Sequence, residues 1–310
     1  MPFGNEACFE TARELWAEAR SAGVNFLDTA DVYAQGRSEE MCAELIADCR
    51  DRVVLASKAY FPTSDDANAR GTSRYHLVRA VEASLRRLRT DRIDLFYLHR
   101  FDEVTALEET LRAVEDLISA GKILYPAVSN FAAWQVAHAL GIARSAHWAP
   151  LVAMQPMYNL VKRQAEVEIL PMAQALQLAV VTYSPTAGGL LTGKYGTTQR
   201  PPSGRLMENQ MYQTRYQAPS NYAVAEAFTA LAHARGLHPA TLATAWVLHH
   251  PGVTSVLLGA RNRDQLRETL AAANLTLDAE TYAAISALSP TPPPATDRNE
   301  EASAHNFGAR

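Results

Sequence analysis

Four polar residues at or just after the ends of apolar runs could together reduce a carbonyl group. Asp28, Lys58 and His99 each end such a run, and Tyr33 lies five positions after Asp28. A phenol has a reference pKa of about 10; a neighbouring Lys cation lowers the pKa of a phenol, and an Asp anchors that Lys. A His can hydrogen-bond a carbonyl oxygen and align it. Because a carbonyl oxygen must be protonated as hydride arrives, this set predicts a catalytic site for carbonyl reduction.

Each of these residues alone has a simpler interpretation. A single Asp at the end of a strand is more often a capping or turn residue, and a single buried His is more often a core residue with a structural hydrogen bond. The catalytic interpretation depends on polar residues standing at equivalent positions in successive runs, because a polar side chain in an interior needs a partner.

Short apolar runs alternate with longer amphipathic ones along the chain. The apolar runs are rich in Val, Ile and aromatic residues, as buried strands are, and cover 25–28, 53–58, 93–99, 123–129, 151–155, 179–184 and 254–259. Helix patterns occupy 6–22, a stretch that starts with Ser38 as its cap, 74–88, 104–120, 131–140, 165–178, 239–249, 262–273 and 278–288. This alternation predicts the α/β class, with a parallel sheet covered by helices.

No change of composition divides the chain, so we expect residues 1–310 to form one domain, a closed (β/α)8 barrel of the TIM type. Active residues of such barrels come from the carboxyl ends of the strands, where Asp28, Lys58 and His99 stand. Two segments interrupt the alternation. Residues 185–219 hold Gly, Pro, Thr and Gln without a strand period and predict a long functional loop, and 289–310 predict an irregular tail.

Composition excludes several classes of protein. The chain has 29 Lys+Arg against 33 Asp+Glu, a net charge of −4, which gives no basic excess for binding nucleic acid. Its 3 cysteines exclude a disulfide-rich scaffold. Glu6 and Glu10 argue against a signal peptide, and no apolar stretch reaches the roughly 18 residues of a membrane span. We therefore expect a cytoplasmic protein without a membrane partner.

Several motifs, in unbroken order from about Phe3 to Leu270, resemble the aldo-keto reductase superfamily. They include Gly-Val-Asn-Phe-Leu-Asp-Thr-Ala-Asp-Val-Tyr at 23–33 and Ile-Asp-Leu-Phe-Tyr-Leu-His-Arg at 93–100. Residues 37–40, 128–131, 155–160, 183–195 and 258–266 extend the similarity. The resemblance implies a barrel that binds NADP(H) without a Rossmann domain and reduces a small-molecule carbonyl substrate. It implies Tyr33 as general acid, Lys58 and Asp28 as the residues that tune it, and His99 as the residue that orients the substrate.

The resemblance also implies a set of cofactor-binding residues. Contacts to the nicotinamide carboxamide are implied for Ser129, Asn130 and Gln155, and stacking on the nicotinamide for Tyr183. A loop over the pyrophosphate is implied for Ser184, Pro185, Ala187, Gly188 and Lys194, with a further phosphate contact from Arg205. Gly259 and Arg261 fit the adenosine phosphate, and a helix N-terminus favours an anion there on physical grounds alone. Gln265 and Glu268 match adenosine contacts.

The sequence departs from the family pattern in a few places. Ala127 stands where Gly is usual, Thr186 where Leu is common, and Thr269 where Asn is usual. The family has a hairpin and a first strand before Phe-Gly, whereas this sequence begins Met1-Pro2-Phe3-Gly4. We therefore expect seven regular strands, with 2–4 as the last trace of the first. We also expect an open seam between Phe26 and Val256, which a partner chain, the tail or local collapse should cover. This seam should weaken cofactor binding.

Some features of the sequence could indicate functions other than carbonyl reduction. Gly188 to Lys194 has the Gly-x4-Gly-Lys spacing of a P-loop, but Tyr195 follows instead of the Ser or Thr that magnesium requires, so we reject NTP hydrolysis. His249-His250 lacks a carboxylate or Cys at ligand spacing, so we expect no metal site. A nucleotide-sensing accessory subunit, similar to the beta subunits of voltage-gated potassium channels, and an inactive remnant stay open. His99 argues against the first of these. The sequence fixes neither the substrate nor the oligomeric state.

Overall fold

The structure of the chain is a computed structural model that describes residues 3–296. It comprises two compact units, each of which is described by itself. Among the described residues, unit 1 holds 3–156, 177–179 and 257–270, and unit 2 holds 157–176, 180–256 and 271–296. All of the predicted catalytic residues belong to unit 1.

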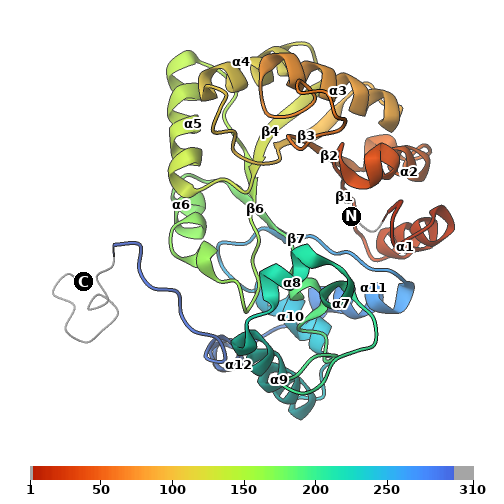
Figure 1. Cartoon of the computed structure of the whole chain (residues 1–310), viewed down its shortest axis with the longest axis vertical. Helices are drawn as coiled ribbons and strands as arrows, with labels where there is room; N and C mark the ends of the chain where they lie inside the picture. Colours follow the sequence, from red (N-terminus) through yellow and green to blue (C-terminus); the bar gives the residue numbers. More distant parts are fainter. Residues whose placement is uncertain (1–2, 297–310) are drawn as a thin grey trace. The chain divides into compact units, whose positions relative to one another are not determined.

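Seven strands form in the order of the chain, at the places where the apolar runs predict them (Figure 1). They are β1 (Phe26–Asp28), β2 (Val54–Ala59), β3 (Ile93–Leu98), β4 (Ile123–Ser129), β5 (Ala153–Gln155), β6 (Ala179–Thr182) and β7 (Ser255–Val256). In unit 1, β1 to β5 pair in parallel with their neighbours, and in unit 2 β6 pairs in parallel with β7. The α/β class and the parallel sheet are therefore confirmed.

The eight-stranded barrel is not confirmed, because the described residues hold seven strands. Phe3 makes an isolated bridge with Ala7 instead of a strand, and Gly4 turns the backbone at φ +81°. The Phe3 side chain packs on a buried cluster of Leu15, Ala260 and Leu266. Pro2 lies outside the described residues, and the seam expected between Phe26 and Val256 stays a prediction, since those two residues belong to different units.

Helices of unit 1 follow the strands in alternation. They are α1 (Phe9–Ser21), α2 (Arg37–Leu45), α3 (Arg74–Leu88), α4 (Leu107–Ser119), α5 (Ala133–Ala146) and α11 (Arg263–Leu270). Consecutive helices from α1 to α5 pack side by side, and α2 to α5 line the outer side of the strands in Figure 1. Ser38 was expected as the cap of α2, but that helix begins at Arg37 after Gly36, and the Ser38 hydroxyl accepts a hydrogen bond from Thr29 Oγ1 at 2.9 Å.

Unit 2 is mostly helical. Its helices are α6 (Ile169–Ala175), α7 (Arg205–Glu208), α8 (Gln210–Tyr216), α9 (Pro219–Ala234), α10 (Pro239–Leu248) and α12 (Ala279–Ser286). The expectation of a loop without regular structure over 185–219 is wrong, because α7 and α8 lie inside it. The Asn209 side chain caps α8 by accepting hydrogen bonds from the backbone N–H groups of Met211 and Tyr212. Pro219 starts α9, a position that suits Pro because its missing N–H has no partner in the first turn.

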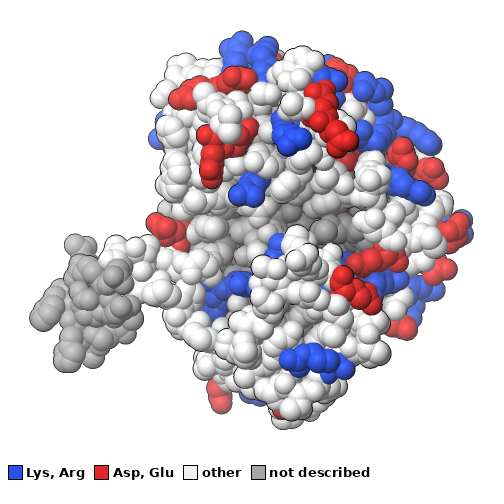
Figure 2. Space-filling view, in the orientation of Figure 1, with Lys and Arg blue, Asp and Glu red and all other residues white. Residues whose placement is uncertain are grey.

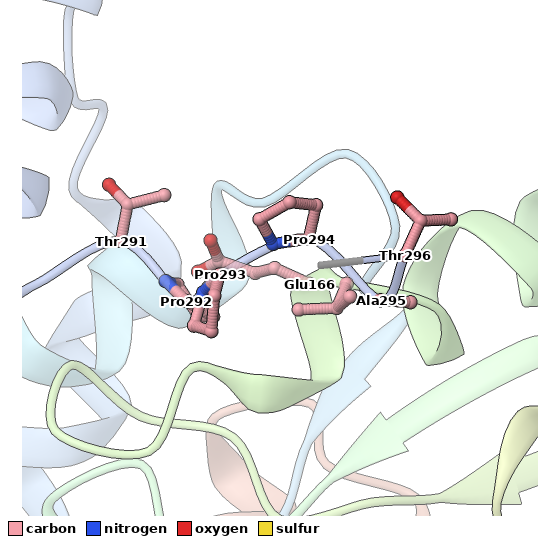
Figure 3. Close-up of a pocket in the computed structure, with 8 residues that line it drawn as sticks. Glu166, Thr291, Pro292, Pro293, Pro294, Ala295 and Thr296 are labelled. Atoms are coloured by element: carbon pink, nitrogen blue, oxygen red, sulfur yellow. The ribbon is translucent and has the colours of Figure 1, made fainter. Parts of the chain in front are cut away.

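The described part of the tail, 289–296, contains no helix or strand. Residues Thr291–Thr296 line a pocket of about 440 Å³ together with Glu166 and Val167 (Figure 3). None of the predicted site residues lines this pocket. The rest of the predicted tail, 297–310, lies outside the described residues. No helix of residues 3–296 has the length and apolar character needed to cross a membrane.

Candidate active site

The register of the sheet explains why polar residues gather at one place in unit 1. Lys58 pairs with Tyr97, Tyr97 with Ala127, and Ser129 with Gln155. Residues paired in register point to the same face, and residues two positions apart on one strand share that face. The deeper positions of this face hold Ala56, Leu95, Tyr97, Ala127 and Ala153, which form a buried apolar cluster. Polar side chains follow this cluster at the carboxyl ends of the strands.

Lys58 and Asp28 form a buried ion pair. The Lys58 ammonium donates hydrogen bonds to Asp28 Oδ1 and, at 2.8 Å, to the backbone carbonyl of Thr29. Asp28 Oδ2 accepts a hydrogen bond from Gln155 Nε2 at 2.8 Å. Burial lowers the pKa of Lys58, and the Asp28 carboxylate opposes that shift by favouring the cation. Both groups are thus held in place by partners that come from three different strands.

Two aromatic rings lie beside the Lys58 ammonium. Its nitrogen is 5.2 Å from the ring centroid of Tyr33 and 5.5 Å from that of Tyr97. These distances are within the range of cation–π attraction. Tyr33 is half-buried and begins a 3-10 turn, Tyr33–Gly36, whose residues Ala34 and Gln35 adopt left-handed backbone angles. The structure therefore brings Tyr33 to the ion pair that the sequence predicts as its neighbour.

His99 completes this group directly after β3. Its backbone N–H donates to the Ala59 carbonyl at 3.0 Å, and its ring meets that of Tyr33 edge-on at 5.7 Å. Burial, together with the positive charge of Lys58, lowers the pKa of His99 to about 3. The imidazole is therefore neutral near pH 7. Its buried Nδ1 has no hydrogen-bond partner among residues 3–296.

The predicted nicotinamide residues form one network at the ends of β4 and β5. Ser129 Oγ donates to the Gln155 carbonyl at 2.9 Å, and Asn130 Nδ2 donates to Ser129 Oγ at 3.0 Å and to the His99 carbonyl at 3.1 Å. Since Gln155 also binds Asp28, this network is continuous with the ion pair. Sequence reasoning placed Gln155 with the cofactor and missed its bond to the Asp28 carboxylate.

A third group of predicted residues precedes and begins α11. Gly259 and Arg261 are exposed, and the Arg261 N–H donates to Gln265 Oε1 at 3.1 Å. Glu268 is half-buried on the same helix. Thr269, which stands where the family has Asn, turns its hydroxyl back to the Leu266 carbonyl at 2.9 Å. The Thr269 hydroxyl thus forms its hydrogen bond within the helix.

Two arginine side chains of α11 form ion pairs with α1. Arg263 and Arg267 both bind the Glu18 carboxylate of α1, at 2.7 Å and 2.8 Å. The two guanidinium groups lower the pKa of Glu18 to about 2. The charge of Arg263, two positions after Arg261, is therefore compensated within unit 1. Over helices α2 to α4 of the same unit, basic and acidic side chains are interspersed on the face shown in Figure 2.

The remaining predicted cofactor residues belong to unit 2. Tyr183 follows β6, and its carbonyl accepts from the Tyr158 N–H at 3.3 Å. Ser184, Ala187 and Gly188 have positive φ, and a Cβ added at Gly188 would lie 2.5 Å from the Tyr212 ring. Two further predicted residues of this unit are the buried Pro185 and the exposed Lys194. Arg205 begins α7 with its guanidinium 5.6 Å from the centroid of the Tyr212 ring.

Asp31 is a buried carboxyl group that sequence reasoning did not single out. It is 2% exposed, and neither of its carboxylate oxygens has a hydrogen-bond partner among the described residues. Burial, and next the nearby Glu39 carboxylate, raise the pKa of Asp31 to about 7. Glu39 is itself paired with Arg87 at 2.7 Å. The signal in the sequence is a second Asp between Asp28 and Tyr33 in an otherwise apolar segment.

The substitution Asp31→Asn should stabilise the protein at high pH and have little effect at low pH. A carboxyl with a raised pKa in the folded state contributes its full stability below about pH 4 and loses it as the pH rises to about 7. With about 1.4 kcal/mol per pKa unit, we expect the variant to gain about 2 to 4 kcal/mol at pH 8. Denaturant unfolding at pH 4.5 and pH 8 measures this difference, with the exposed Asp65→Asn as control. An equal effect of Asp31→Asn at both pH values would contradict a buried neutral Asp31.

Comparisons with known proteins show the family to which the chain is similar. Residues 1–290 match the Aldo/keto reductase family. The chain is 35% identical to the uncharacterized oxidoreductase YrpG of Bacillus subtilis (strain 168) over 307 residues, which cover 94% of this chain and 91% of that protein. It is 36% identical to human aldo-keto reductase family 7 member A3 over 293 residues, 88% of this chain and 86% of that protein.

Another relative is named for a different role. The chain is 35% identical to the probable voltage-gated potassium channel subunit beta of Oryza sativa subsp. japonica, over 278 residues that cover 88% of this chain and 84% of that protein. The family match spans nearly the whole chain, and the similar proteins are matched over most of their own length. The chain belongs to the aldo/keto reductase family.

Proposed function

We propose that this protein reduces an aldehyde or ketone to an alcohol with NADPH as the hydride donor. The observation that carries the proposal is the convergence of Tyr33, Lys58, Asp28 and His99 at one end of the unit 1 sheet. A phenol, a buried ammonium and a neutral imidazole supply the proton and the orienting hydrogen bond that carbonyl reduction needs. The match to the aldo/keto reductase family supports the same reaction class.

The residues of unit 1 fit NADP(H) on two counts. A 2′-phosphate needs a cation, and Arg261 is exposed just before the N-terminus of α11, where the helix dipole also favours an anion. The carboxamide of nicotinamide needs both donors and acceptors, which Ser129, Asn130 and Gln155 carry on neighbouring strand ends. When bound, this cofactor would supply the hydride.

The chain's own residues divide the work on the substrate. The neutral His99 imidazole donates a hydrogen bond to the carbonyl oxygen and fixes its direction. Tyr33 gives its phenolic proton to the same oxygen as negative charge develops there, and the Lys58 ammonium stabilises the phenolate that remains. Asp28 holds the ammonium in position, and Gln155 holds Asp28.

A second candidate is an accessory or sensing subunit that binds NADP(H) and catalyses little. The similarity to the potassium channel subunit beta favours it. Both candidates predict cofactor binding, so turnover separates them. We expect purified protein to oxidise NADPH when aldehydes and ketones are supplied, and to quench its own fluorescence on titration with NADPH. Quenching without turnover on a broad panel of carbonyl compounds would favour the sensing subunit. The absence of both quenching and turnover would indicate an inactive protein.

Arg261→Ala should weaken binding of NADPH and leave binding of NADH nearly unchanged. The two cofactors differ by the 2′-phosphate, and a charge-assisted hydrogen bond to phosphate is among the strong ones, so we expect the NADPH constant to rise roughly tenfold or more. Arg263→Ala is the matched control, because the Arg263 guanidinium is already bound to Glu18. Equal losses for both cofactors in Arg261→Ala would remove Arg261 from this role.

A further inference from the structure

The loop between β2 and α3 covers one side of His99. Residues Tyr60–Ser73 leave the sheet directly after β2, and the ring of Phe61 meets the His99 imidazole edge-on at a centroid distance of 4.9 Å and an interplanar angle of 81°. Phe61 in turn meets Tyr60 edge-on at 5.2 Å. Phe61 therefore occupies space next to the imidazole that would orient the carbonyl oxygen.

The base of this loop is fastened by one carboxylate from the loop after β3. Asp102 Oδ2 accepts hydrogen bonds from the Thr72 N–H at 2.8 Å and from Thr105 Oγ1 at 2.8 Å, and Oδ1 accepts from the Val104 N–H at 3.0 Å. The Thr72 hydroxyl also approaches Asp102 Oδ2, at 3.3 Å. Hydrogen bonds to an ionised acceptor are stronger than neutral ones. The same carboxylate thus binds its own loop and the end of the Phe61 loop.

Two further features fit a loop closed on Asp102. The Gly71 N–H donates to the Tyr60 carbonyl at 2.8 Å and so joins the two ends of the loop. Gly71 has φ +81°, and a Cβ at this position would lie 2.7 Å from Asp102 Oδ2, so the close approach of the carboxylate requires Gly. The backbone N–H bonds to Asp102 outweigh burial and lower its pKa, so the carboxylate is ionised at neutral pH. Between these fastened ends, residues 62–68 are exposed.

We propose that Phe61 determines which carbonyl substrates reach His99, and that Asp102 is the positioning residue that holds Phe61 there. This inference rests on the proposed carbonyl reduction. A carbonyl oxygen bound by His99 has its substituents close to the Phe61 edge. Aldehydes and unbranched ketones fit beside that ring, whereas a bulky branched substituent collides with it. Loosening the loop or shortening Phe61 should therefore admit branched ketones.

The test compares substrate preference with loop stability in the full-length protein. We expect Phe61→Ala to raise kcat/KM for a branched ketone such as pinacolone relative to propanal by roughly tenfold or more, because even one methylene group in an apolar pocket discriminates by about this factor. Asp102→Asn should move the ratio in the same direction, mainly through KM. Combining the two should add little, because both act on the same contact. Glu103→Gln, an exposed neighbour on the same loop, is the matched control.

A second measurement is independent of activity. Arg70 is exposed, and trypsin can cleave after it once the Arg70–Gly71 bond opens locally. We expect Asp102→Asn to be cut there roughly tenfold faster than wild type, and Phe61→Ala and Glu103→Gln to be cut at nearly the wild-type rate. Equal cleavage of Asp102→Asn and Glu103→Gln would overturn the role of Asp102. An unchanged substrate ratio in Phe61→Ala would overturn the role of Phe61, and a wild type that reduces no carbonyl would count against the proposed function instead.

Discussion

Replacement of Tyr33 by Phe should remove nearly all carbonyl reduction and leave cofactor binding intact. The substitution deletes only the phenolic hydroxyl, and proton transfer by a positioned side chain contributes roughly 10²–10⁴-fold to a rate. The ring that faces His99 at 5.7 Å and Lys58 at 5.2 Å stays in place, so the neighbouring groups keep their packing. The loss should therefore appear in kcat, while NADPH titration by fluorescence gives an unchanged constant.

A matched control for this experiment is Tyr97→Phe. Tyr97 is fully buried, its ring lies 5.5 Å from the same ammonium, and its hydroxyl has no hydrogen-bond partner among the described residues. Burial raises the pKa of Tyr97, which makes its hydroxyl a poor proton donor. We expect Tyr97→Phe to keep its rate within a few-fold of wild type. A Tyr33→Phe protein that keeps more than about a tenth of the wild-type rate would show that Tyr33 is not the general acid.

Replacement of Lys58 by Met should slow reduction roughly 10²-fold and move the pH profile upward. Lys58 is fully buried beside the Tyr33 ring, so its loss removes the positive charge that favours the phenolate. The phenol then stays protonated to higher pH, and the alkaline fall in kcat should begin at a higher pH than in wild type. A rate–pH series from pH 5 to pH 10 measures both effects.

The control for Lys58 is a lysine with a different carboxylate partner. Lys122 of unit 1 forms an ion pair with Glu82 at the surface. Lys122→Met should leave both the rate and the pH profile unchanged, because surface ion pairs contribute little to stability and this one does not contact the site. If Lys58→Met is slow but has an unshifted profile, Lys58 is only a structural partner of Asp28.

Those parts of the fold that follow from local pattern were predictable from the sequence. Each of the seven strands has a run of apolar residues long enough to identify, and the residue that ends β1 or follows β3 is the first polar residue after its apolar run. Period-two alternation then places Lys58 and Tyr97 on the face that holds Ala127. The residues of the catalytic group could therefore be predicted from where each strand ends and from the alternation of side chains along it.

Contacts between residues far apart in the chain could not be predicted in the same way. Gln155 is separated by 127 positions from Asp28, whose carboxylate it binds. Arg263 lies near the start of a helix, where a cation could bind phosphate, yet its guanidinium forms an ion pair with Glu18 of α1. Nothing local to Arg263 indicates that α1 packs on α11. Such pairings depend on tertiary packing, which one sequence does not encode in its periodicity.

Two helices of unit 2 show a different limit. The sequence of α9 is rich in Ala and has apolar residues on several faces, so it lacks the single apolar stripe by which the other helices were identified. The short α8 depends on Asn209 as its cap within a segment that otherwise has the composition of a loop. Capping and tertiary packing outweigh composition here, and the predicted loop over 185–219 fails for that reason.

In the proposed reaction, hydride reaches a carbonyl carbon and Tyr33 supplies the proton. Transfer of label from NADPH that carries two deuterium atoms at C4 tests it most directly, with benzaldehyde as substrate and mass spectrometry of the benzyl alcohol formed. We predict that wild type transfers deuterium in step with NADPH oxidation, and that Tyr33→Phe binds NADPH equally well and forms almost no labelled alcohol. Tight binding of NADPH by a wild type that transfers no deuterium to any carbonyl compound, or transfer by Tyr33→Phe at the wild-type rate, would contradict the claim.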